Sequence, residues 1–139
     1  MAESSPKTGI PLHATWWLQL VLAAIIALGS MFGGAMLVVE PGGSLIGMDT
    51  AVLTGTPFSD FTLPGWILIV ILGFGHAVTF VLTLLGSKTA ARAAMIMGIA
   101  LVIWILVQLG MIGYQIALQP LFGILGVIEA INGYRRRRS

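Results

Sequence analysis

A histidine in the middle of an apolar, charge-free stretch is the first residue of this sequence that could do chemistry. His76 lies between two small-residue flanks in the segment GFGHA at 73–77. An ionisable side chain at the centre of a membrane helix costs about 2.5–3.5 kcal/mol, so it prompts a functional hypothesis. Such a histidine can ligate haem or another pigment, or relay protons. The other interpretation, which we favour, is a neutral histidine hydrogen-bonded to a neighbouring helix, with Gly73 and Gly75 permitting close packing.

A haem held from both sides needs two axial ligands, and this chain supplies only one at that depth. The second histidine, His13, lies near the N-terminus, just before the first expected span at 15–39. We therefore expect no cofactor, while a pigment- or haem-associated subunit that uses His76 stays open as an alternative.

Glu129 is the second ionisable residue within an apolar stretch, about two helical turns before a run of arginines. In a small antiporter it would be the natural proton or cation site. The interpretation we favour is an interfacial carboxylate that extends toward the cytoplasm and meets Arg135 or Arg136, because the last apolar stretch is short.

Two glutamines complete the set of polar candidates within the apolar stretches. Gln108 follows Trp104 by four residues and therefore shares its helix face. It could line a polar crevice, but a hydrogen bond across helices is the interpretation we favour. We expect Gln19 to face the cytoplasmic interface. If the protein transports a solute, His76, Glu129, Gln108 and Gln19 would line the route.

Motifs for catalysis and for metal binding are missing from the sequence. It contains no cysteine, which excludes disulfides and thiolate metal sites. It also lacks GxSxG, HExxH and phosphate-loop motifs. Asp49 and Asp60 have no histidine nearby that would make them a metal site. We therefore expect a protein that is not an enzyme and binds no metal.

The composition identifies the class of protein that must position these residues. The 139 residues are 58% hydrophobic and 9% charged, with a mean hydropathy of +1.01. A soluble domain carries about 25% charge, so these few charges cannot cover a soluble globule. The same numbers exclude intrinsic disorder and a basic nucleic-acid-binding face. A polytopic membrane protein remains.

Four apolar segments are long enough, or nearly so, to cross a bilayer core that takes about 20 helical residues. Pro64 and Pro120 suit helix starts, and the segment EPGG at 40–43 is a strong helix stop. The sequence thus predicts a single all-α domain over 1–139, a four-transmembrane-helix bundle. Its expected spans are 15–39, 64–86, 90–113 and 119–134, with an outer loop at 40–63.

Basic residues determine the expected orientation, because cytoplasmic loops are rich in lysine and arginine. With four spans, every lysine and arginine falls on one side of the membrane, while Glu40, Asp49 and Asp60 fall on the other. Both termini are therefore expected in the cytoplasm. The C-terminal residues form a basic anchor that attracts anionic lipid at about 1 kcal/mol per residue. This anchor comprises Arg135, Arg136, Arg137 and Arg138.

The loop at 40–63 is half apolar, which is unusual for a disordered connection. Asp49 is placed to cap a short helix that runs to Leu53. We expect a compact, partly structured cap over the mouth of the bundle.

Small residues recur along two of the expected helices and let helix backbones approach closely. One row comprises Ala23, Ala27, Ser30 and Gly34, and the other comprises Ala90, Ala94 and Gly98. Oligomerisation is one interpretation; we favour packing within one chain, because four helices need such faces anyway.

Three stretches resemble sequences of a known group: PGGSLIGM at 41–48, GTPFSDFTLPG at 55–65, and IWILVQ at 103–108 with LQP at 118–120. Together they resemble uncharacterised small bacterial four-helix integral membrane proteins. The resemblance implies the same topology and a bacterial inner (cytoplasmic) membrane. It implies no catalytic or binding residue.

The leading functional hypothesis is therefore a non-enzymatic structural or accessory subunit that associates with a larger membrane complex. Its expected partners are the lipid bilayer and other membrane subunits or copies of itself, and no nucleic acid. The first alternative is a small homo-oligomeric transporter or channel, and the second is the pigment-associated subunit described above.

Overall fold

The structure is a computed structural model that describes residues 12–113, 115 and 117–138. These residues form helices and connecting turns and contain no β-strand, which confirms the all-helical prediction. The long helices are α1 (Leu12–Val39), α4 (Ala90–Ile112) and α5 (Leu118–Arg138). A further helical rod comprises α2 (Thr62–Ile67), the π-helical turn η3 (Leu68–Gly73) and α3 (Phe74–Leu84).

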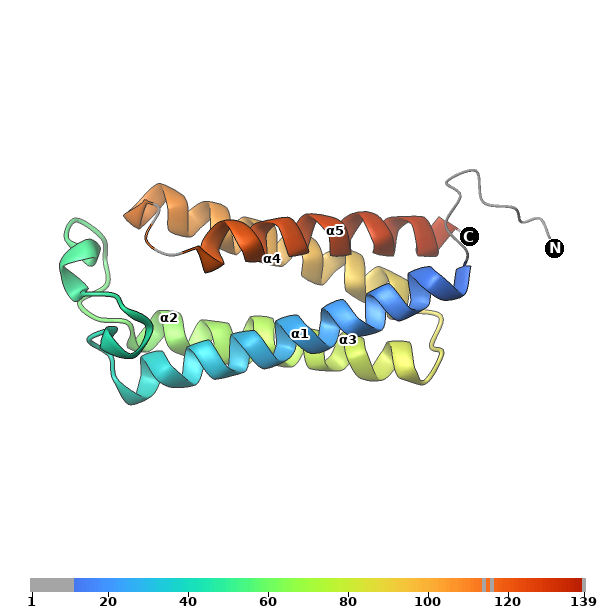
Figure 1. The fold of residues 1–139 in the computed structure, drawn as a ribbon, viewed down its shortest axis with the longest axis horizontal. Coiled ribbons are helices and arrows are strands. Elements are labelled where there is room, and N and C mark those ends of the chain that lie inside the picture. Colours follow the sequence, from blue (N-terminus) through green and yellow to red (C-terminus); the bar gives the residue numbers. More distant parts are fainter. Residues whose placement is uncertain (1–11, 114, 116, 139) are drawn as a thin grey trace.

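The helices form two antiparallel pairs (Figure 1). The first pair is α1 with the rod α2–η3–α3, and the second is α4 with α5. The two pairs pack together along α1 with α5 and along α3 with α4. The connection between the two members of the first pair lies at one end of the molecule. The turn after α3 and the C-terminal end of α5 lie at the other end (Figure 1).

Three helical stretches have the length and apolar composition needed to cross a membrane: His13–Val39, Thr62–Leu84 and Ala90–Met111. Their outward side chains are large and apolar. Leu28 and Phe32 on α1 are each 69% exposed. Exposed apolar surface on this scale is the opposite of what a water-soluble protein shows. α5 is the fourth helix of the bundle and is less apolar.

A glycine with a left-handed backbone conformation ends α3. Gly86 has a φ of +71°, and its N–H donates to the Thr83 carbonyl at 3.1 Å. Ser87 N–H donates to the Leu82 carbonyl at 2.9 Å. These two bonds satisfy carbonyls that the end of α3 would otherwise leave without donors.

The core lies where the two helix pairs meet, around Ile26, Leu72 and Leu101, which are at most 1% exposed. Small residues bring the backbones together around it. A Cβ atom added at Gly98 would lie 2.6 Å from the Ala130 backbone nitrogen. Ala94, one turn earlier, is fully buried. The small-residue faces therefore pack within this chain, as we favoured.

The connection between α1 and α2 is folded onto the helix ends. It contains two 3-10 helices, η1 (Ser44–Ile46) and η2 (Thr50–Leu53). The Asp49 carboxylate accepts from the Ala51 N–H at 2.9 Å, which is the predicted cap. Leu37, Leu53 and Phe61 form a small core of their own beneath the connection. The segment is thus a compact cap over the helix ends.

Candidate functional site

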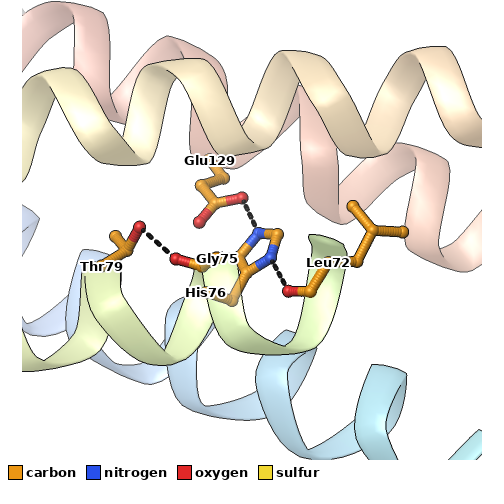
Figure 2. Close-up of polar contacts among 5 residues, drawn as sticks. All are labelled: Leu72, Gly75, His76, Thr79 and Glu129. Carbon is orange, nitrogen blue, oxygen red and sulfur yellow. Dashed lines mark hydrogen bonds and ion pairs between the residues drawn. The ribbon is translucent and has the colours of Figure 1, made fainter. Parts of the chain in front are cut away.

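The two ionisable residues singled out in the apolar stretches meet inside the bundle. His76 lies on α3 and Glu129 on α5, and His76 Nε2 is 2.7 Å from Glu129 Oε1 (Figure 2). Their side chains are 0% and 1% exposed. The contact joins residues 53 positions apart and links one helix pair to the other.

The backbone decides how the protons are placed on this pair. His76 Nδ1 is 2.7 Å from the Leu72 carbonyl oxygen, which can only accept a hydrogen bond. Nδ1 therefore carries a hydrogen and donates it. One further proton lies between Nε2 and Oε1, either on the imidazole or on the carboxyl. In both arrangements the pair has no net charge, which is why two ionisable groups can be buried together.

The second carboxylate oxygen of Glu129 is the unsatisfied part of the site. Glu129 Oε2 is buried and has no hydrogen-bond partner. In Figure 2 it lies on the Thr79 side of the pair. The Thr79 hydroxyl does not reach it, because that hydroxyl donates to the Gly75 carbonyl at 3.0 Å. A buried carboxylate oxygen without a donor is an open position for a proton or another donor.

Polar side chains continue from this pair toward the end of the bundle that carries the C-terminal arginines. Gln19 on α1 donates to the Thr83 hydroxyl at 2.7 Å, and Thr83 donates to the Thr79 carbonyl at 2.7 Å. Asn132 on α5 donates to the Thr15 carbonyl at 2.9 Å. One half of the bundle interior is therefore polar and hydrogen-bonded between helices.

Our favoured interpretation of Glu129 as an interfacial side chain that reaches the arginines is wrong. Its carboxylate turns inward and contacts His76. α5 remains helical through Arg138, so Arg135 stands about 9 Å farther along the helix axis. His76 lies beside Glu129 in the bundle interior. The buried hydrogen bond to His76 takes the place of the water that would solvate the Glu129 carboxylate at the membrane interface.

Gln19 also differs from expectation. We expected it at the cytoplasmic interface, but its side chain is fully buried. α1 begins at Leu12, which places Gln19 two turns inside the helix. Gln19 Nε2 donates to the Thr83 hydroxyl, while Gln19 Oε1 is buried without a hydrogen-bond partner among the described residues.

Gln108 makes the contact that we favoured for it. Gln119 on α5 donates to Gln108 Oε1 on α4 at 3.3 Å, the expected bond across helices. Arg136 donates to the Thr15 hydroxyl at 3.2 Å, while Arg135 and Arg137 are exposed. The side chain of Arg138 lies outside the described residues.

The structure does not favour His76 as a ligand for haem or another pigment. Both ring nitrogens are engaged, one by the Leu72 carbonyl and the other by Glu129. An axial bond would require the 2.7 Å contact to Glu129 to break. Within the described ranges, no cluster of three histidine, aspartate or glutamate residues could hold a metal ion.

A second feature, the apolar cavity, lies at the opposite end of the bundle under the α1–α2 connection. It has a volume of about 430 Å³. Its walls come from α1, the connection, α2, η3, α4 and α5 and include Gly33, Phe58, Leu101 and Phe122. Sequence reasoning missed this cavity, because residues from six separate segments form it.

Comparison with protein-family models, with curated proteins and with solved structures found no match to this chain. The function is therefore argued from the geometry of the site itself. Sequence reasoning also missed the His76–Glu129 contact, although the order of the helices and the position of each residue within its helix point to it. α3 and α5 run in the same direction, and each residue stands a similar distance before the end of its helix.

Proposed function

We propose that this chain is an integral membrane protein whose four helical rods all cross the bilayer. α5 is the fourth span, although its mean hydropathy is lower than that of the others. Its polar residues Gln119, Glu129 and Asn132 are at most 5% exposed. Its outward face carries Leu121 and Ile124, which are 48% and 58% exposed. The polar residues within the apolar part of α5 are thus turned away from lipid, and the C-terminal arginines follow that part.

The proposed orientation places both termini in the cytoplasm of a bacterial cell. Lys88 lies in the turn between α3 and α4, and Arg92 lies in the first turn of α4. The turn between α3 and α4 is at the same end of the bundle as the C-terminal end of α5 (Figure 1). Glu40, Asp49 and Asp60 lie in or beside the connection at the other end. Lys7 lies outside the described residues. This separation of charge supports the positive-inside orientation, and the resemblance noted above supports the bacterial inner membrane.

Within that membrane we propose a non-enzymatic accessory subunit of a larger membrane complex. The observation that carries this proposal is the direct, buried contact between His76 and Glu129. A catalyst or an ion carrier must present its ionisable groups to a substrate or an ion, whereas these two are buried and bonded to each other. The His76–Glu129 contact instead joins the α1/α2–η3–α3 helix pair to the α4/α5 helix pair, and the joined helices present a defined apolar surface. Such a surface can pack against other membrane subunits.

Purification from native membranes in a mild detergent tests this proposal, with co-purifying proteins identified by mass spectrometry. We expect a stoichiometric set of partners. Glu129→Ala should weaken the packing between the two helix pairs and lower partner recovery. The matched control, Glu40→Gln in the exposed connection, should leave partner recovery unchanged. A homogeneous homo-oligomer without any partner would contradict the accessory role.

Proton-coupled transport by a homo-oligomer is the second candidate, and one observation favours it. Glu129 Oε2 has no partner and faces the polar half of the bundle interior. The test is proton-driven flux in proteoliposomes. Glu129→Gln keeps a hydrogen bond to His76, because its amide can donate to Nε2, but it cannot exchange a proton. Flux that survives Glu40→Gln and disappears in Glu129→Gln would replace the accessory role with transport.

A further inference from the structure

The apolar cavity has the size and composition of a small-molecule site. Its volume of about 430 Å³ falls within the range of about 300–1,000 Å³ that ligand pockets occupy. None of the residues described as lining it is charged, and most are aliphatic or aromatic. Such walls favour a hydrocarbon ligand over a polar metabolite.

Two hydrogen-bond donors on the cavity wall have no acceptor among the residues that the structure describes. The Ser30 hydroxyl and the Trp104 indole N–H are both buried without a partner. Ser30 is 1% exposed. A serine or threonine in a helix commonly donates to the carbonyl one turn earlier, and Thr79 and Thr83 do so on α3. Ser30 lines the cavity and makes no such bond.

Gly33 leaves space in the same wall. A Cβ atom added there would meet nothing within 4 Å. Its neighbour Gly34 differs, because an added Cβ would lie 2.6 Å from the Gly65 carbonyl oxygen. Close helix packing thus explains Gly34 and does not explain Gly33. Gly33 therefore leaves open space on the cavity wall, which an occupant of the cavity could fill.

We propose that the cavity binds one membrane-soluble molecule that has a hydrocarbon chain and a hydrogen-bond-accepting carbonyl oxygen. The chain would lie against the aliphatic and aromatic walls, and the oxygen would accept from Ser30 and Trp104. An acyl ester of a phospholipid and an isoprenoid quinone share this chemistry. The site requires the proposed membrane location and is independent of the proposed accessory role.

Native mass spectrometry of protein purified from its own membranes in a mild detergent tests the site. The wild-type chain should retain one lipid-like molecule, and the mass of that molecule distinguishes a phospholipid from a quinone. Gly33→Leu should fill the cavity and abolish retention. Gly110→Leu is the matched control, because Gly110 is also helical and open to added atoms but does not line the cavity. Retention that is equal in all three proteins, or absent from the wild type, would overturn the proposal.

The donors are tested with two added probes, a decyl-substituted benzoquinone and phosphatidylglycerol, each titrated into delipidated protein. Ser30→Ala and Trp104→Phe each remove one donor and should weaken binding of the retained class by about threefold to tenfold. Melting temperatures should stay near that of the wild type, which separates lost binding from lost folding. Binding of both probes that neither substitution changes would overturn the assignment of the donors. Partner recovery in the purification described above is expected to be unaffected by Gly33→Leu, so the two proposals can fail separately.

Discussion

At the scale of single residues, the contact between His76 and Glu129 shows how two ionisable groups are kept inside an apolar bundle. Leu72 holds the hydrogen on Nδ1, and one shared proton keeps the pair neutral as a whole. Each side chain depends on the other, because burial of either one alone would leave a charge or a polar group without a partner.

This dependence predicts strong coupling between the two residues. His76→Ala and Glu129→Ala should each lower the free energy of unfolding by about 3–5 kcal/mol, as expected when one partner of a buried pair is removed. The double variant should cost clearly less than the two single costs combined, because it leaves no orphaned group. Unfolding in detergent, followed by circular dichroism, measures all three. His13→Ala, at an exposed histidine, is the control and should change little. Additive costs would mean that the contact contributes nothing.

At the scale of helices, glycine has opposite roles at different places on α4. Gly98 lets α4 approach α5, since an added Cβ would lie 2.7 Å from the Gly126 carbonyl oxygen. Gly110, three turns later on the same helix, is exposed and has open space around it. The same substitution should therefore change stability in opposite directions at these two positions.

Gly98→Ala should destabilise the protein by about 1–3 kcal/mol, because the clash is with backbone atoms that cannot rotate away. Gly110→Ala should stabilise it by up to about 1 kcal/mol through helix propensity alone. Thermal unfolding of both variants in the same detergent provides the comparison. A neutral Gly98→Ala would mean that α4 and α5 are not held as closely as the structure places them.

At the scale of the whole molecule, charge and exposed apolar surface set its relation to the membrane. The cap over residues 40–61 carries acidic residues, and the turn between α3 and α4 carries Lys88. These two connections lie at opposite ends of the bundle (Figure 1). A four-span protein with cytoplasmic termini must expose them on opposite sides of the membrane.

The chain has no cysteine, so any introduced cysteine is a unique label site. We expect Ser59→Cys, in the cap, to react with a membrane-impermeant maleimide on intact spheroplasts. Thr89→Cys, in the turn before α4, should react only after the membrane is permeabilised. Both positions are exposed in the structure, so burial does not limit the reaction. Labelling of Thr89→Cys on intact cells would reverse or disprove the proposed orientation.

The amino-acid sequence by itself determined the helices and their approximate ends. Runs of apolar residues, Pro64 and the stop after Val39 are local signals, and helix formation depends on local hydrogen bonds. The cap on Ala51 by Asp49 was predictable for the same reason, because the two residues are neighbours. His76 and Glu129 were also identified as unusual, since each interrupts an apolar stretch.

Only the tertiary structure decided which side chains meet. In a membrane bundle the faces toward lipid and toward the core are both apolar, so the hydropathy pattern does not mark the inward face of a helix. Phe32 and Ile26 look alike in the sequence, yet one is 69% exposed and the other is fully buried. The His76–Glu129 contact and the apolar cavity both depend on how each helix is turned about its axis. Packing between helices sets that rotation, and no short stretch of sequence contains it.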